Sequence, residues 1–336
     1  MIGLQVLPLL ATTAGSGHNN LNEDTRMLPI DQVQLHFNPG TLAGLNVILG
    51  LVMFGIALDL RVADFRVAFK SPKGLLLATV GHHIIFPAMT YALIWVMKPV
   101  PSIALGMILV SSCPAGHLSN FLTHLARGNT ALSVSASAVS TALAIVMTPL
   151  NFNFWGNLHP ITHDLMRTIS LDPLVMLKDI VILLGLPLVA GMSVAHKFPR
   201  FAARAEKPMK RFSMVVFAAF VVGALAANFQ HFIQYIQFVV VVVLIHNGLA
   251  LVTGFSLSTL LGLSDRDRRS VTFEMGIQNS GLGLILIFNL FNGLGGMAII
   301  TAWWGIWHIV SGLALALYWS KRDPRQAALA QPGAAT

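Results

Sequence analysis

Apolar stretches of about 20 residues, long enough to cross a lipid bilayer as a helix, recur along most of this chain. A segment inside lipid must satisfy its own backbone hydrogen bonds, and an α-helix does so within itself. Only 10% of the 336 residues are charged, whereas a soluble domain typically carries about 25%. Together these observations predict an all-α polytopic membrane protein.

Nine membrane-spanning helices are expected, with short polar connections between them. The predicted helices cover residues 41–59, 74–97, 103–126, 130–150, 173–195, 213–229, 236–262, 270–292 and 297–318. Met1–Gly15 is apolar but short, and contains Gln5 and Pro8. It is a trimmed first spanning helix, an interfacial segment or a leftover leader. The predicted number of spans is therefore nine, or ten with this stub.

The basic residues fall mainly in alternate connections and after the last predicted helix. The positive-inside rule places these connections and the tail, residues 319–336, in the cytoplasm. Residues 16–40, which are polar, then lie outside, and we expect a multi-pass protein of the cell (inner) membrane. The net charge of +8 does not indicate nucleic-acid binding, because it is confined to short loops.

Two sets of four predicted helices follow one another at a nearly constant offset. Their first residues lie near 41, 74, 103 and 130, and again near 213, 236, 270 and 297. With one further helix before each set, each unit has five helices, and an odd number inverts the second unit in the membrane. Inverted repeats of this kind are common in transporters.

The third helix of each set contains residues that interrupt a helix. The two segments read Ser111-Ser112-Cys113-Pro114-Ala115-Gly116-His117-Leu118-Ser119-Asn120 and Glu274-Met275-Gly276-Ile277-Gln278-Asn279-Ser280-Gly281. Proline removes a helical hydrogen bond, and glycine loosens the backbone. Unwound backbone at membrane depth persists only where it is buried in protein or lines a cavity. Breaks at matching positions in two inverted halves predict a binding site near the midplane.

Glu274 is an acidic side chain inside the predicted span 270–292, beside the second interruption. A carboxylate in hydrocarbon is costly, so it normally faces a cavity, a partner or a bound cation. The amide and hydroxyl oxygens beside it in the sequence suit a small hard cation. The alternative is a structural acid that hydrogen-bonds a neighbouring helix.

In these residues the chain resembles the bile acid:sodium symporter family, in particular its bacterial members. The resemblance follows family order from residue 41 to about residue 318. The matching stretches are Met53-Phe54-Gly55 with Asp64-Phe65; Cys113-Pro114-Ala115-Gly116 with Ser119-Asn120; Leu125-Ala126-Arg127-Gly128-Asn129 with Ala131-Leu132-Ser133; His246-Asn247-Gly248; Glu274-Met275-Gly276-Ile277-Gln278-Asn279-Ser280-Gly281; and Trp307-His308.

The resemblance implies a panel domain of residues 41–70 and 173–229. It implies a core domain of residues 71–150 and 236–318, in which two broken helices cross. Residues 1–40 would form the N-terminal segment. The implied function is sodium-coupled import of a small organic anion by alternating access, without enzymatic activity.

The resemblance also implies two sodium sites and a substrate site. The first sodium site would use Ser119, Asn120, Ser133, Ser137 and Glu274. The second would use Glu274, Gln278, the carbonyls of Met275 and Ile277, and a glutamine whose position here holds His82. The substrate would meet His117, Asn279 and His308.

Three departures from the family leave parts of this reading open. An imidazole is a poor sodium ligand, so with His82 the second site is weakened or uses a proton instead. His117 stands where relatives often carry threonine, and Ile309 where they often carry asparagine, so substrate choice is open. Simpler roles also exist, because Ser133 and Ser137 can merely permit close helix packing. His117 can cap a helix break, and His308 can hydrogen-bond within the core.

Two other classes of protein compete with this reading. One is a metalloid or drug efflux carrier of related architecture, proton-coupled through His82 or Glu274, with Cys113 as a soft ligand. The other is an intramembrane enzyme, for which the spans offer no His-Glu-x-x-His pair. The substrate and the oligomeric state are not readable from the sequence.

Overall fold

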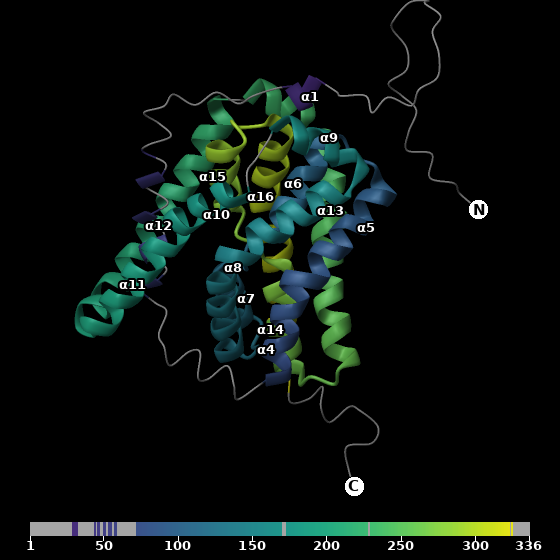
Figure 1. Ribbon diagram of the computed structural model, residues 1–336. Coiled ribbons are helices and arrows are strands. Elements are labelled where there is room, and N and C mark those ends of the chain that lie inside the picture. Colours follow the sequence, from purple (N-terminus) through teal and green to yellow (C-terminus); the bar gives the residue numbers. More distant parts are fainter. Residues whose placement is uncertain are drawn as a thin grey trace, which may run out of the picture.

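The computed structural model describes residues 29–32, separate positions between 44 and 58, the ranges 72–169, 173–227 and 229–322, and Pro324. All elements in these ranges are helices, apart from one isolated bridge. The predicted helix 41–59 is described only at separate positions, and Met1–Gly15 and most of the tail lie outside the described residues. The fold is all-α, as predicted (Figure 1).

Five helical stretches in the described ranges are long and apolar enough to cross a membrane: Pro72–Met97, Thr130–Leu158, Leu174–Lys197, Val239–Leu260 and Gly295–Ser320. Large apolar side chains lie on the outside of these helices, among them Leu76, Val96, Val189, Val252 and Leu260. An outer surface of this kind fits lipid rather than water. The chain is therefore a polytopic membrane protein.

The long helices are mostly where the hydropathy pattern predicts them. The first stretch is α4 (Pro72–Val80), a π-helical turn η1 (Gly81–Ile85) and α5 (Phe86–Met97). The others are α8 (Thr130–Leu158), α13 (Phe229–Leu260) and α16 (Gly295–Ser320), and the sequence α10 (Pro173–Ile180), η2 (Val181–Gly185) and α11 (Leu186–Lys197). A short helix, α1 (Pro29–Gln32), precedes them.

Several predicted boundaries differ from the helix ends, and those of α12 and α8 differ most. Helix α12 (Pro199–Ala227) begins well before residue 213, because the basic stretch ahead of the apolar residues is itself helical. Helix α8 continues past residue 150 and is followed by α9 (Pro160–Ile169), where a connection was expected. A prediction based only on the length of apolar stretches does not find helices of mixed polar and apolar composition, such as α9 and the start of α12.

Both predicted interruptions are confirmed. The first helix divides into α6 (Pro101–Ser112) and α7 (Leu118–Leu125), and the second into α14 (Asp265–Gly276) and α15 (Ser280–Leu290). Cys113 is extended, with φ −71° and ψ 155°, as the residue before a proline prefers. Ile277 is extended as well, with φ −113° and ψ 108°. In Figure 1, α6 and α15 lie in one half of the molecule and α7 and α14 in the other.

The two unwound segments pair with each other. Gly116 N donates to Ile277 O at 2.8 Å, and Asn279 N donates to Pro114 O at 2.9 Å. They flank an antiparallel bridge between Ala115 and Gln278. Buried backbone groups need hydrogen-bond partners, and here each interrupted helix supplies partners for backbone groups of the other. The two breaks therefore meet at one place, which we call the crossing.

A proline also explains the π-helical turn η1. Pro87 has no N–H to donate to His83 O, four residues earlier, so the helix is locally irregular there. Asn151 of α8 supplies the missing donor, with its Nδ2 2.8 Å from His83 O. The turn is thereby fixed against α8, and it carries two histidines, His82 and His83, into the protein interior.

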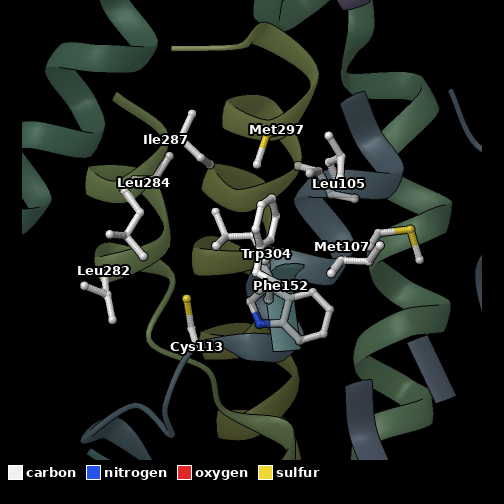
Figure 2. Packing of buried hydrophobic residues seen from close by; sticks show 14 of the residues in the cluster. Leu105, Met107, Cys113, Phe152, Leu282, Leu284, Ile287, Met297 and Trp304 are labelled. Atoms are coloured by element: carbon white, nitrogen blue, oxygen red, sulfur yellow. The ribbon is translucent and has the colours of Figure 1, made fainter. Parts of the chain in front are cut away.

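A large apolar cluster holds the half of the molecule that contains α6, α15 and α16. Figure 2 shows side chains of α6, α15 and α16 around a common centre, together with Phe152 of α8. They are Leu105 and Met107 of α6, Leu282, Leu284 and Ile287 of α15, and Met297 and Trp304 of α16. Lipid tails are as apolar as these side chains, so close packing rather than exclusion of water holds such helices together.

Gly116→Ala tests how tightly the breaks meet. A Cβ at residue 116 would lie 2.9 Å from Gln278 O and 3.2 Å from its carbonyl carbon. Backbone cannot move aside as a side chain does, so we expect a loss of about 1–3 kcal/mol in stability. The readout is the melting temperature of the detergent-purified protein.

Gly223→Ala in α12 is the matched control. Its Cβ would meet no atom of the described residues within 4 Å, so this variant should keep or raise the melting temperature. Equal melting temperatures for Gly116→Ala and the wild type would contradict the close approach at the crossing.

Candidate functional site

Glu274 of α14 lies beside the crossing and is 2% exposed. Three serine hydroxyls surround its carboxylate. Ser119 Oγ of α7 lies 2.5 Å from Oε1, Ser133 Oγ of α8 lies 2.6 Å from Oε1, and Ser137 Oγ of α8 lies 3.0 Å from Oε1 and 2.9 Å from Oε2. All three serines are fully buried. The structure thus brings together residues predicted for one site from three helices.

Asn120 completes this group, and its side-chain oxygen lies 2.8 Å from Ser133 Oγ and 3.2 Å from Ser137 Oγ. Each serine hydroxyl has a single hydrogen to donate. Ser133 nevertheless has two acceptors within reach, and Ser137 has three. With the serine oxygens counted as acceptors too, six side-chain oxygens share four hydrogens: one from each serine and the one that Thr123 Oγ1 donates to Ser133 Oγ at 3.2 Å. A cation placed among these oxygens would interact with the lone pairs that receive no hydrogen bond.

Local sequence explains why these side chains meet. Ser133 and Ser137 are four residues apart on α8 and share one face. Ser119 and Asn120 lie in the first turn of α7, immediately after the break. The α7–α8 turn is fixed to α14, because Asn129 Nδ2 donates to Asp267 Oδ1 at 2.7 Å and Asn129 N donates to Ser270 Oγ at 2.9 Å.

Arg269 is a buried anchor that sequence reasoning missed. Its Nη1 donates to Ala126 O at 2.7 Å and Trp319 O at 3.1 Å, and its Nη2 lies 2.7 Å from Asp265 Oδ2. It therefore ties the start of α14 to the ends of α7 and α16. It follows Arg266 and Arg268 in a basic run, which made it look like one more loop charge.

His82 reaches both interruptions at once. Its Nε2 lies 2.7 Å from Cys113 O and its Nδ1 lies 3.1 Å from Glu274 O. In a continuous helix these carbonyls would accept from the amides of His117 and Gln278, so the two breaks have released them. The neighbouring ring of His83 lies in edge contact, with 4.9 Å between centroids.

His83 supports the first break indirectly. Its Nε2 lies 3.1 Å from Ser140 Oγ, and that hydroxyl oxygen accepts from Ala115 N at 3.1 Å. Ser140 was not among the predicted site residues. Its position three residues after Ser137 on a helix could have revealed it, since it lies near the same face.

The other carbonyls freed at the end of α14 also have donors. Gln278 Nε2 donates to Met275 O at 2.8 Å, Asn247 Nδ2 donates to Gly276 O at 2.8 Å, and Gly116 N donates to Ile277 O. Gln278 Oε1 is buried and has no hydrogen-bond partner among the described residues. The residues predicted for a second ion site are thus adjacent, but their carbonyls are already hydrogen-bonded.

The three predicted substrate residues lie in different surroundings. His117 precedes α7 and is partly buried. Asn279 precedes α15, and its Oδ1 accepts from Leu282 N at 3.0 Å, so it caps that helix. His308 of α16 is 6% exposed and its Nδ1 has no partner among the described residues. The first two therefore flank the crossing, and the third is a core residue of α16.

Helix ends add fixed partial charges at the crossing. The N-termini of α7 and α15 and the C-termini of α6 and α14 meet there. Helix N-termini favour anions and C-termini favour cations.

Cys113, the soft ligand considered for an efflux carrier, is buried in the apolar cluster near Leu282 (Figure 2). Among the described residues, no three His, Cys, Asp or Glu side chains gather as a metal site.

Fold and site together define an all-helical, multi-pass membrane protein with two interrupted helices joined at their breaks. The chain belongs to the sodium bile acid symporter family, whose model matches residues 46–235. It is 31% identical over 284 residues to a Bacillus subtilis protein named uncharacterized sodium-dependent transporter YocS, covering 84% of this chain and 85% of that one.

Plant and animal proteins are similar as well. The chain is 29% identical over 288 residues to the probable sodium/metabolite cotransporter BASS1 of Arabidopsis thaliana chloroplasts, covering 85% of this chain and 68% of that protein. It is 27% identical over 234 residues to the mouse P3 protein, covering 70% of this chain and 48% of that protein. The predicted family is confirmed.

Ser140→Ala tests the support of the first break. The change leaves the buried Ala115 N–H without its acceptor, which costs about 1–3 kcal/mol. We expect a lower melting temperature in detergent. Ser258→Ala is the control, because Ser258 Oγ donates to Gly254 O within one helix, where the carbonyl keeps its backbone donor. Equal melting temperatures for both variants would contradict this role of Ser140.

Proposed function

We propose that this protein is a sodium-coupled symporter that imports a small organic anion. One observation carries the proposal: a buried carboxylate, three buried hydroxyls and an amide oxygen form a cluster that is short of hydrogens. Hard cations bind such oxygen shells. The names of the relatives, sodium-dependent transporter and sodium/metabolite cotransporter, support sodium as the ion.

The proposed sodium ligands all lie in this cluster: Ser119, Asn120, Ser133, Ser137 and Glu274. The single negative charge of Glu274 balances a monovalent cation, and the neutral oxygens replace its water. The oxygens lie 2.5 to 3.2 Å apart, as hydrogen-bonded pairs do, so sodium would have to separate them and replace these hydrogen bonds with its own contacts.

The anion would bind next to the cation, at the N-termini of α7 and α15. There the helix dipoles favour negative charge. His117 and Asn279 stand at these two ends and are the best placed to contact it. His308 of α16 is the third candidate contact. Asn279 uses Oδ1 for its cap, which leaves its amide hydrogens for a ligand.

Coupling follows from the shared crossing. Sodium would draw α7, α8 and α14 together at Glu274, and α7 carries one of the proposed anion contacts. Each ligand would then favour the other's binding by the same factor. Movement of the core domain, residues 71–150 and 236–318, against the panel domain, residues 41–70 and 173–229, would give alternating access in the inner membrane, with the C-terminus in the cytoplasm.

The alternative is a proton-coupled carrier or a metalloid or drug exporter of the same architecture, without enzymatic activity in either case. Uptake into proteoliposomes separates the two. Tracer panels of steroid, short keto or hydroxy acid and sulfonated anions are offered under an inward sodium gradient, an inward potassium gradient and a pH gradient. Uptake that requires sodium supports the symporter. Uptake driven equally by the pH gradient in potassium would favour the alternative.

Glu274→Gln tests the central ligand. The substitution keeps the shape and removes the charge, so sodium should no longer stabilise the protein. The stabilisation expected for the wild type is about 2.7 kcal/mol at a hundredfold excess over the dissociation constant. The measurement is the melting temperature in sodium and in potassium. Asp265→Asn, on the same helix, is the matched control and should keep the sodium effect. A full sodium effect in Glu274→Gln would contradict the assignment.

Ser133→Ala and Ser137→Ala test the hydroxyl ligands. Each removes one oxygen from the proposed shell without removing charge. The sodium concentration for half-maximal stabilisation should rise about tenfold, which corresponds to about 1.4 kcal/mol. Ser258→Ala should leave it unchanged. If both variants titrate like the wild type, the ion binds elsewhere.

A further inference from the structure

His82 lies between the two interruptions and faces one backbone carbonyl of each. It comes from a third helical stretch, yet its ring lies between Cys113 O of the first break and Glu274 O of the second. It is 1% exposed. The ring therefore fills the place where a cation could join the two breaks through their freed carbonyls.

We infer that this protein binds one sodium ion per transport cycle, because the His82 ring excludes a second ion at the crossing. The inference rests on the proposed function, since it counts the ions that a sodium-coupled carrier would use. It concerns the residues around His82 alone and leaves the cluster around Glu274 Oε1 and Oε2 as the single ion site.

The chemistry of the ring argues against a cation beside it. In either tautomer, one ring nitrogen carries a hydrogen that points to a backbone carbonyl, and a charged ring would carry two. The carbonyl that accepts this hydrogen has a lone pair engaged. An N–H also presents its positive end to any ion placed between the breaks, where an amide oxygen would present its negative end.

The remaining oxygens do not make a shell either. Met275 O, Gly276 O and Ile277 O each accept a hydrogen bond from within the protein. The Glu274 carboxylate is turned to the three serines. Gln278 Oε1 alone is left without a partner in this part of the described structure, and one oxygen does not replace the several that a hard cation takes.

The two groups of oxygens therefore differ in kind. Around Glu274, acceptors outnumber hydrogens, so a cation is favoured. Around His82, three freed carbonyls of α14 already have donors and the fourth, Glu274 O, faces the ring, so a cation would have to compete with hydrogen bonds that hold the two breaks together. Breaking such bonds in a site without water is costly.

Equilibrium binding of radioactive sodium to the purified, detergent-solubilised protein tests the inference. We expect saturation at about one ion per molecule and a Hill coefficient of about one, since the coefficient cannot exceed the number of sites. His82→Gln replaces the N–H with an amide that offers an oxygen, and should double the bound sodium. His83→Gln makes the same change at the neighbouring residue and should leave one ion bound.

Each outcome has a distinct meaning. Two ions on the wild type would overturn the inference while leaving the symporter proposal in place. No sodium on the wild type would overturn both. One ion on a folded His82→Gln variant would show that the ring is not what excludes the second ion. If that variant does not fold, the count on the wild type still decides.

Discussion

Backbone groups released by a broken helix inside a membrane must find partners in the protein, because lipid offers none. The structure around the crossing follows from this constraint. The two unwound segments exchange hydrogen bonds through Gly116 and Asn279, and side chains from neighbouring helices supply the remaining donors. Gly116 allows the segments to approach, and the π-helical turn before Pro87 brings His82 to both of them.

The side-chain cluster at Glu274 differs from the hydrogen-bonded backbone around it. Its oxygens come from α7, α8 and α14, and they share too few hydrogens. Stability alone would favour an apolar residue or a matched donor at such a position, since burying a charge in hydrocarbon is expensive. The arrangement is understandable if a cation arrives and leaves, and if the helices that carry the oxygens move with it.

Much of this architecture could be predicted from the sequence for physical reasons. Apolar length marks the spans, Pro114 and Gly276 mark the breaks, and the four-residue spacing of Ser133 and Ser137 places them on one face. Helix α9 and the early start of α12 were missed because amphipathic helices lack that apolar length. The bonds of His82 were beyond reach, since they depend on how three segments distant in sequence meet. The inverted repeat and the division into panel and core stay predictions.

The ring of His82 also bears on how strongly such a carrier can concentrate its cargo. A tenfold sodium gradient stores about 1.4 kcal/mol per ion. With one ion per monovalent anion, the highest accumulation ratio equals the sodium ratio itself. The cycle then moves no net charge, so the membrane potential, worth about 2.3 kcal/mol per charge per 100 mV, adds nothing. With a second ion, the highest accumulation ratio would be the square of the sodium ratio. The cycle would then move one net charge, so the membrane potential would drive accumulation as well. With the inferred single ion, the His82 ring would set the upper limit of accumulation, which suits uptake of a plentiful substrate rather than of a trace substrate.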